Sequence, residues 1–318
     1  MPKYDFLVVG SATLDVFART HQIERIDISG NRSKGAEHLV CITFGSKTDL
    51  AGLDIFPGGS AANSAVAMQR LGSETALLAC VGNDHFGSVA LKDLENNEVD
   101  TSCVAFDKRL GTGVGINLAA PSGEKSMLVY RGANDALGPE HLSEGMIKSA
   151  RHVFITSLVS QKNFSLFLKI VKMAKKHHRP IIFAPSVSML HKWLPQLRRL
   201  HSGFAVSIFN YEEGSYYTSK ETVREILRRL PGNVDVVSKD ADGAYAKEGT
   251  NFFHVKALPV RIVNTLGAGD AFSGAFAHYY YRNGVHSVGD ALSKAVGIAG
   301  LKLTQRGARL SCSVKEAA

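Results

Sequence analysis

Short, continuous apolar runs alternate along most of the chain with longer segments whose apolar residues recur every three to four positions. Such runs are typical of strands buried on both faces of a parallel sheet, and the spaced residues are typical of covering helices. The expected strands are residues 6–9, 75–81, 153–155, 181–184, 205–209 and 234–238. The expected helices are residues 61–71, 86–96, 163–178, a segment around Trp193, 220–230 and 271–281. This alternation predicts a three-layer α/β/α fold with a mostly parallel central sheet.

Two stretches break the alternation. Residues 11–56 are polar and contain short alternating pieces such as 39–44, and residues 104–131 contain alternating glycines and a turn signal at 121–123. Such pieces are typical of half-exposed antiparallel strands. We therefore expect insertions at about 13–56 and 104–131 to form a small β-sheet lid on one domain that spans residues 1–318.

The glycine-rich stretch 264–270 is the strongest chemical signal in the chain. The apolar run 260–263 precedes it and helix-compatible residues follow, which predicts a strand-to-helix turn. The first N–H groups of a helix lack partners and carry the positive end of its dipole, so a phosphate can approach them closely. Asp270 then has two interpretations: it caps the helix, or it takes the proton from an attacking hydroxyl. In the second case the phosphoryl group lies against Gly267, Ala268 and Gly269.

Three further loops at the carboxyl ends of expected strands carry polar groups, and ligands bind at this edge of open parallel sheets. Asp15 can bind sugar hydroxyls or belong to an ordinary turn. The glycine pair 58–59 allows close backbone approach, and the amide of Asn63 can donate and accept hydrogen bonds, although a turn and a small-residue helix explain both. Asn210 and Glu213 can hold Mg²⁺ through water or cap a helix.

Composition narrows the class of protein. With 45% hydrophobic and 21% charged residues, the 318-residue chain is typical of a globular protein. Its formal charge of +8 comes from Lys and Arg spread along the chain, so nucleic-acid binding is not expected. No signal-peptide layout or apolar run near the ~20 residues of a membrane span is visible, and the four cysteines lack metal-like spacing. We expect a soluble, cytoplasmic protein with reduced thiols and no membrane partner.

Several enzyme classes lack their motifs in this sequence. G-x-x-x-x-G-K-[ST] does not occur, which excludes a P-loop NTPase, and no G-x-G-x-x-G follows the first expected strand. The histidines form neither H-x-x-x-H nor H-E-x-x-H, and no G-x-S-x-G elbow is present.

Two separated stretches resemble the signatures of the PfkB/ribokinase family of carbohydrate and nucleoside kinases. Residues 57–72, with 81–87 downstream, are similar to the amino-terminal signature, and residues 264–272 are similar to the carboxyl-terminal one. Asn210 and Glu213 resemble the family's N-x-x-E element, and residues 130–134 resemble a loop on the substrate side. The resemblance covers essentially the whole chain and implies the ribokinase-like fold.

The resemblance implies that ATP phosphorylates an alcohol, usually a hydroxymethyl group of a sugar or nucleoside. Asp270 would be the general base, and the N–H groups of residues 267–269 would neutralise phosphoryl charge. The acceptor would be bound by Asp15, Gly58, Gly59, Asn63 and Arg131. ATP would be bound by Asn210, Ser238, Gly243, Thr265, Gly267 and Gly269, and Mg²⁺ by Glu213 and Asn210 through water. The lid would close over the acceptor and, as in several relatives, pair two subunits.

The chain departs from the family pattern at three places, one of which is residues 183–188, where many relatives have an Asn or Asp before the proline. Asn264 stands where the family often has an Asp that, in the ribokinase branch, helps hold a monovalent cation, which weighs against potassium (K⁺) activation. Asp240 stands where a glycine is common in the nucleotide-side motif, whereas Ser238 and Gly243 fit it.

Three functions remain open on sequence grounds. The first is an ATP-dependent sugar kinase, and the second is an adenosine-like nucleoside kinase on the same fold. The third is a non-catalytic sensor of a sugar or nucleotide, which would bind ligand and release no ADP.

Overall fold

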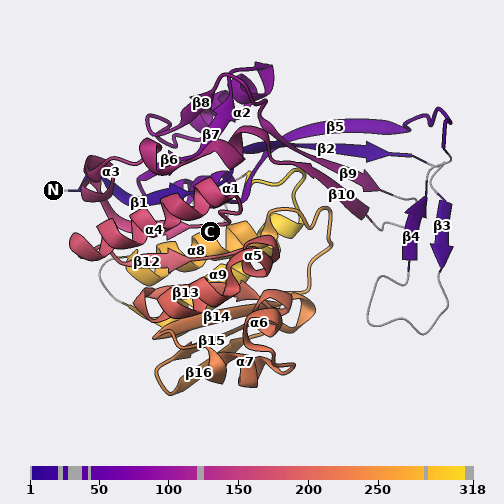
Figure 1. Cartoon of the computed structure of the whole chain (residues 1–318). Coiled ribbons are helices and arrows are strands. Elements are labelled where there is room, and N and C mark those ends of the chain that lie inside the picture. The colour runs from indigo at the N-terminus through magenta and orange to yellow at the C-terminus, as the bar shows by residue number, and fades with distance from the viewer. Residues whose placement is uncertain are drawn as a thin grey trace.

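An eight-stranded sheet runs through the centre of the protein in the order β16-β15-β14-β13-β12-β11-β1-β6 (Figure 1). The structure is a computed structural model that describes residues 2–20, 24–27, 38–41, 44–119, 125–282 and 286–311. The six strands from β6 to β14 are parallel, as predicted, whereas β15 and β16 add an antiparallel edge. The strands are β1 (Tyr4–Val9), β6 (Thr75–Leu78), β11 (Ala150–Ile155), β12 (Ile181–Phe183), β13 (Val206–Asn210), β14 (Val234–Lys239), β15 (Gly243–Glu248) and β16 (Asn251–Val255).

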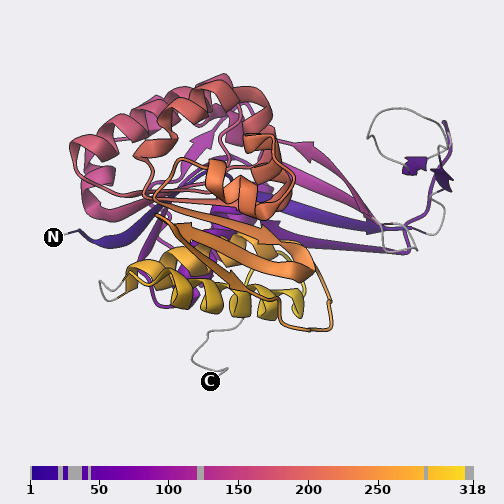
Figure 2. The same cartoon turned by 90° about the horizontal axis from the view of Figure 1, so that it is seen from below.

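Helices cover both faces of this sheet, which gives the predicted three layers (Figure 2). One face carries α1 (Ser60–Arg70), α8 (Ala268–Tyr281) and α9 (Val288–Leu303), with α2 (His85–Asn96) beside them. The other carries α3 (Glu144–Ser149), α4 (Gln161–Lys176), α5 (Val187–Leu200), α6 (Tyr211–Thr218) and α7 (Val223–Arg229). Short 3₁₀ turns are η1 (Gly132–Ala136), η2 (Pro139–His141), η3 (His201–Gly203) and η4 (Asp240–Asp242). No helix in the described part of the chain is long and apolar enough to span a membrane.

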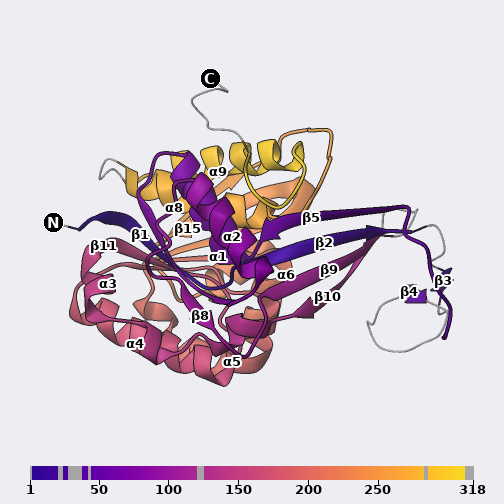
Figure 3. The same cartoon turned by 90° about the horizontal axis from the view of Figure 1, so that it is seen from above.

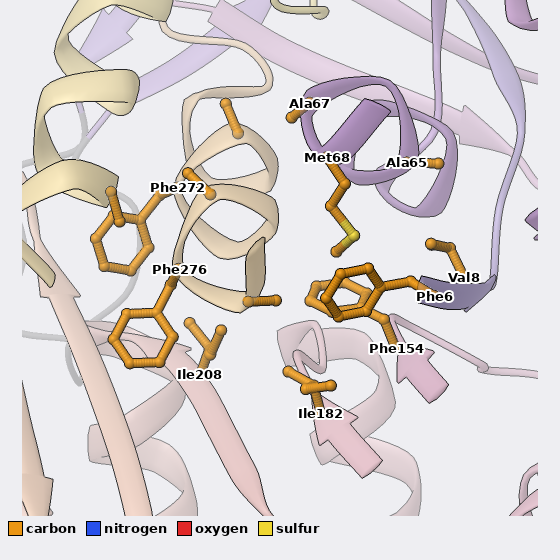
Figure 4. Packing of buried hydrophobic residues seen from close by; sticks show 14 of the residues in the cluster. Phe6, Val8, Ala65, Ala67, Met68, Phe154, Ile182, Ile208, Phe272 and Phe276 are labelled. Atoms are coloured by element: carbon orange, nitrogen blue, oxygen red, sulfur yellow. The ribbon is translucent and has the colours of Figure 1, made fainter. Parts of the chain in front are cut away.

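A buried cluster joins α1 and α8 to the middle of the sheet (Figure 4). Met68 of α1 and Phe276 of α8 pack over side chains from four parallel strands, which are Phe6, Phe154, Ile182 and Ile208. Burial of such side chains contributes about 1.5–3 kcal/mol each to folding. The two helices are therefore held side by side, and so are the loops from which they start.

A second, four-stranded sheet extends from the body in the order β10-β9-β2-β5 (Figures 1 and 3). Its strands are β2 (Thr13–Arg19), β5 (Gly52–Gly58), β9 (Gly113–Ala119) and β10 (Lys125–Tyr130). We call it the lid sheet; it combines the two predicted insertions. β9 runs parallel to β2, although antiparallel strands were expected, and the other neighbours are antiparallel. A separate pair, β3 (Glu24–Asp27) and β4 (His38–Cys41), follows β2 in the chain, and the expected turn at 121–123 lies outside the described residues.

Two sequence predictions differ from the structure in detail. The expected strand 75–81 is divided at Ala79 into β6 and β7 (Cys80–Gly82). β7 then pairs with β8 (Ala105–Asp107), so the start of the second insertion does not join the lid sheet. The alternation of apolar and polar residues predicts that a segment is a strand, but not which strand it pairs with. The pairing of β8 with β7 was missed for this reason. Of the cysteines, Cys80 and Cys103 are free thiols among the described residues.

The prediction of a strand at residues 260–263, before the glycine-rich stretch, was wrong. β16 ends at Val255, and the chain has no regular structure from there to α8. Ile262 and Val263 are 60% and 52% exposed. The backbone N–H groups of Val263 and Asn264 donate to the carbonyl of Leu303 at 2.8 and 3.2 Å, instead of to a neighbouring strand. The turn therefore connects a loop, held by the end of α9, to α8.

Candidate active site

Helix α8 starts at a glycine that no other residue can replace without strain. Gly267 has a φ of 75°, in the left-handed region, and a Cβ atom there would overlap the carbonyl oxygen of Ala308. No side chain caps this end of the helix. The first turn of α8 therefore has no side-chain cap that would compete with a bound anion, and its anion-binding role stays a prediction.

Asp270 lies in this first turn and is held by α1. Asn63 Nδ2 donates to Asp270 Oδ2 at 2.8 Å, and Ser64 Oγ donates to the backbone oxygen of Asp270 at 3.1 Å. Asp270 makes no side-chain cap on α8, although as an acidic residue in the first turn it is still a favourable partner of the helix dipole. Its carboxylate instead joins the two glycine-rich stretches of the sequence, which lie more than two hundred residues apart.

A cavity of about 170 Å³ opens beside Asp270. Loops after several parallel strands line it, as expected for the carboxyl edge of such a sheet. The predicted site residues among its walls are Asn210, Glu213, Ser238, Gly269 and Asp270. The other lining residues are largely small or polar: Ser60, Ser64, Thr156, Ser157, Ala184, Pro185, Ser186, Ile208, Phe209 and Ser273.

Burial raises the pKa values of the two carboxyls that face this cavity. The pKa of Asp270 rises to about 6, although hydrogen bonds from Asn63 and Ser60 and the positive charge of Lys302 oppose the rise. The pKa of Glu213 rises to about 7, first through burial and further through the negative charges of Asp270 and Glu212. Two carboxylates so arranged favour a cationic ligand and a proton-accepting role near neutral pH.

Asn210 and Glu213 cap α6 as well as lining the cavity. Asn210 Oδ1 accepts from the Glu213 N–H at 2.8 Å, and Glu213 Oε2 accepts from the Asn210 N–H at 2.9 Å. In the described part of the chain, no group of three or more His, Cys, Asp and Glu side chains is placed to hold a metal ion. Mg²⁺ needs only one or two carboxylates when it keeps its waters and binds phosphate oxygens, so these residues fit it.

Asp15 lies on the lid sheet, where glycines make room for its carboxylate. A Cβ atom on Gly58 would overlap Asp15 Oδ2, and one on Gly115 would come within 2.8 Å of Asp15 Oδ1. Gly59, at a φ of 95°, similarly has the backbone of Ser11 beside it. Burial raises the pKa of Asp15 to about 7. The negative charge of Asp270 adds to this rise, and the positive charge of Arg309 opposes the rise. Asp15 and Asp270 therefore interact electrostatically across one site.

Most of the predicted binding residues do not line the cavity; they are Asp15, Gly58, Gly59, Asn63, Arg131, Gly243, Thr265 and Gly267. Gly243 lies in the turn before β15, at a φ of 91°. Thr265 is exposed before α8, and its carbonyl accepts from the Ala268 N–H at 3.4 Å. Arg131 lies near Asp135. Burial raises the pKa of Asp135, and the positive charge of Arg131 opposes this rise. Their binding roles stay predictions.

The carboxyl-terminal part of the chain supplies two charges that the sequence analysis missed. Lys302 is fully buried in α9, and its charge lowers the pKa of Asp270. Arg309 is buried, forms an ion pair with Asp93 of α2 and acts on Asp15. A lysine among the apolar residues of an otherwise buried helix was the only signal for Lys302, and nothing local marked Arg309 as buried.

The side chain of Asn264 forms hydrogen bonds within the turn itself. Its Oδ1 accepts from the Leu266 N–H at 2.9 Å, and its Nδ2 donates to the Gly307 carbonyl at 3.4 Å. The amide thus joins the loop before α8 to the turn that follows α9.

Comparison with known proteins gives a consistent result. The pfkB family carbohydrate kinase profile matches residues 36–315. Among curated proteins, the chain is similar to the deoxyribokinase of Salmonella typhi, at 27% identity over 325 residues that cover 96% of this chain and 95% of the relative.

Solved structures share the fold over the whole length. An adenosine kinase from Sinorhizobium meliloti has a TM-score of 0.81 at 21% identity and covers 99% of this chain and 100% of its own. A ribokinase from Arabidopsis thaliana, in complex with ribose and ATP, has a TM-score of 0.80 at 22% identity and covers 97% and 95%. These likenesses confirm the ribokinase-like fold. With a family profile matched across most of its length, the chain belongs to the pfkB family of carbohydrate kinases, phosphotransferases that act on a hydroxyl group.

Proposed function

We propose that the protein transfers the γ-phosphoryl group of ATP to a hydroxyl, most naturally a hydroxymethyl group, of a small sugar. The observation that carries this proposal is the position of Asp270, hydrogen-bonded to Asn63, at the uncapped start of α8. A base and an anion-binding turn within one helical turn are what phosphoryl transfer requires, since it depends mainly on positioning and electrostatics.

In the proposed reaction the acceptor oxygen forms a bond to the γ-phosphorus, and the bond from that phosphorus to the leaving ADP oxygen breaks. Asp270 receives the hydroxyl proton, for which its raised pKa of about 6 is suited. The N–H groups of residues 267–269 stabilise the charge on the phosphoryl oxygens. Asp15, Gly58, Gly59, Asn63 and Arg131 are proposed to hold the acceptor's other hydroxyls.

ATP and Mg²⁺ are the cofactors that this site fits. Asn210, Ser238, Gly243, Thr265, Gly267 and Gly269 are proposed to hold the nucleotide, and Glu213 with Asn210 to hold Mg²⁺ through water. When bound, Mg²⁺ neutralises phosphate charge. The negative charges of Glu213 and Asp270 beside the cavity support a divalent cation there.

A nucleoside kinase is the second candidate, and one observation favours it. Phe17 and Phe56 lie edge to face, 5.7 Å apart, on the same side of the lid sheet as Asp15. Aromatic side chains suit a nucleoside base, whereas Asp15 can bind the hydroxyls of a free sugar or of a nucleoside and so favours neither. Similarity to a deoxyribokinase supports the sugar.

The experiment that tests the proposal measures ADP release with ATP and Mg²⁺ for ribose, 2-deoxyribose, fructose, adenosine and inosine. We expect turnover with a sugar and weaker turnover with the nucleosides.

Asp270→Asn should retain the wild-type circular dichroism spectrum and reduce kcat by about 10²–10⁴-fold. If this variant keeps most of its activity, the assigned base is wrong; binding without ADP release from any acceptor would identify a sensor.

We also propose that the lid sheet pairs two copies of the chain. The strand register aligns Ile116, Val16 and Ile55 on the face opposite Asp15, and Leu128 lies beside Ile116. We call this the outer lid face. Ile55, Ile116 and Leu128 are large, apolar and exposed, as is Leu53 further along β5. An extended apolar face of this kind is typical of a protein interface.

A further inference from the structure

The inner face of the lid sheet, on the side of Asp15, carries a second buried polar side chain. β2 and β9 pair with Asp15 opposite Gly115 and Phe17 opposite Asn117. Successive side chains on a strand alternate between faces, so Asn117 lies on the same face as Gly115, over which the Asp15 carboxylate rests. Asn117 is therefore one inward position further along the lid than Asp15.

Asn117 is enclosed, but the hydrogen-bond donor of its side chain is not used. The residue is 1% exposed, and its Nδ2 donates to no acceptor in the described part of the chain. Its cross-strand neighbours, Phe17 and Met127, offer no carbonyl or hydroxyl from their side chains. A buried amide without a partner is destabilising, and an apolar side chain of similar volume would suit these neighbours better.

A bound acceptor would give this amide its partner. Two strand positions separate the level of Asp15 from that of Asn117, about 7 Å along the sheet, so one sugar molecule can contact both. The chemistry of the two groups is complementary, because an ionised Asp15 only accepts hydrogen bonds whereas Asn117 Nδ2 donates them.

We propose that Asn117 is a specificity-determining residue that donates a hydrogen bond to an oxygen of the sugar acceptor. The acceptor is thus a polyhydroxylated compound with an oxygen beyond the group that Asp15 holds, on the lid side of the site. This inference rests on the proposed function in that it takes the acceptor to be a sugar under the lid.

The test compares wild-type protein with Asn117→Leu in equilibrium binding without turnover. Calorimetry measures the Kd of D-ribose, 2-deoxy-D-ribose and adenosine in the absence of nucleotide, and the Kd of ATP in the absence of acceptor. We expect the Asn117→Leu protein to bind the preferred sugar about 10–100-fold more weakly and ATP as tightly as the wild type. Its Tm without ligand should rise, because the unpartnered amide is gone.

Two further variants make the result decisive. Asn117→Ala removes the amide without adding bulk and should weaken sugar binding to a similar degree, even if a leucine side chain does not fit. Ser207→Ala is the matched control, because Ser207 is also 1% exposed with an unpartnered Oγ but lies in β13 of the central sheet. It should leave both Kd values unchanged.

The outcomes separate this inference from the proposed function. Sugar affinity that changes less than twofold in both Asn117 variants overturns the inference, and so does equal weakening of sugar and ATP binding, which would indicate a structural role. Binding that depends on Asn117 without any ADP release supports the inference and contradicts the kinase function. If neither sugar binds the wild-type protein, the inference is overturned, whereas the kinase function is decided by ADP release with the full set of acceptors.

Discussion

Three carboxyl groups with raised pKa values meet around one site: Asp15, Glu213 and Asp270. Burial is the main cause in each case, and the charge of Asp270 adds to the rise at the other two. Lys302 and Arg309 offset part of this negative charge. A residue pattern read from sequence cannot give these values, because the burial depends on the lid, α6 and the carboxyl-terminal segment together.

The raised pKa of Asp270 predicts the pH dependence of catalysis. A base must be deprotonated, so kcat should fall as the pH decreases through about 6, and protonation of Asp15 and Glu213 near pH 7 should weaken substrate binding. Initial rates and KM values between pH 5 and pH 9 measure both effects. A rate that stays constant down to pH 5 would contradict Asp270 as the base.

Stability should change in the opposite direction over this range. A carboxyl whose pKa is higher in the folded than in the unfolded protein favours folding below the unfolded pKa, and this contribution is lost as the pH rises through the folded pKa. For these groups the window runs from about pH 4 to about pH 7. As the pH falls through this window, their contribution to stability increases while activity decreases. If Tm stays constant or rises as activity is lost, the loss comes from titration of the site and not from acid unfolding.

At the scale of elements, the sequence predicts the central strands and most helices because their patterns are local. It fails at 260–263, where an apolar run is held by the end of α9, and at β7 and β8, whose pairing brings together segments far apart in the chain. The antiparallel edge formed by β15 and β16 was also missed. For the candidate site, local patterns are enough to propose Asp270, Asn63 and Asp15, whereas the burial of Asn117, Lys302 and Arg309 depends on distant elements.

The start of α8 gives a prediction at this scale. Gly267→Ala forces an alanine into the left-handed region and against the Ala308 carbonyl, so the turn must move. We expect kcat to fall by about 10²–10³-fold, as when a donor to a reacting oxygen is lost. Steady-state ADP release measures this, together with Tm.

The matched control is Gly297→Ala in α9, where a Cβ atom would meet no other atom within 4 Å. Because alanine favours helix over glycine, Tm should rise slightly while kcat stays unchanged. Equal activities of the two variants would contradict the role of the turn.

A buried ionic cluster connects the elements on the other side of the sheet. His201 Nε2 lies 3.0 Å from Asp235 Oδ1, and Lys247 Nζ lies 3.0 Å from Asp235 Oδ2. His201 Nδ1 also lies 2.9 Å from the hydroxyl of Tyr217. The cluster ties η3, α6, β14 and β15 together. No sequence pattern predicts it, because its members are single residues on separate elements.

Removing the central carboxylate should destabilise the fold strongly. Asp235→Ala leaves the ammonium of Lys247 buried without its carboxylate, which costs about 3–5 kcal/mol. Urea unfolding measures the loss. Asp242→Ala, which breaks the exposed ion pair with Lys239, is the control and should leave the free energy of unfolding nearly unchanged. Similar losses in both variants would show that burial does not matter here.

At the scale of the whole molecule, the lid sheet extends from the body with its outer lid face exposed. We expect Leu128→Lys to convert a dimer to a monomer, because a buried ammonium opposes pairing of the apolar faces. Light scattering after size-exclusion chromatography measures the mass. The control is Leu168→Lys on α4, also exposed, which should not change it. A wild-type protein that is monomeric at all concentrations would contradict the proposal.

The turn after α9 touches both halves of the site. Gly307 lies against the ring of Phe56 on β5 of the lid sheet, and the carbonyl of the next residue, Ala308, supports Gly267 at the start of α8. One short segment therefore lies against both β5 of the lid sheet and the turn at the start of α8. Under the proposed function, a displacement of the lid sheet would therefore shift this segment and, with it, the backbone at the start of α8.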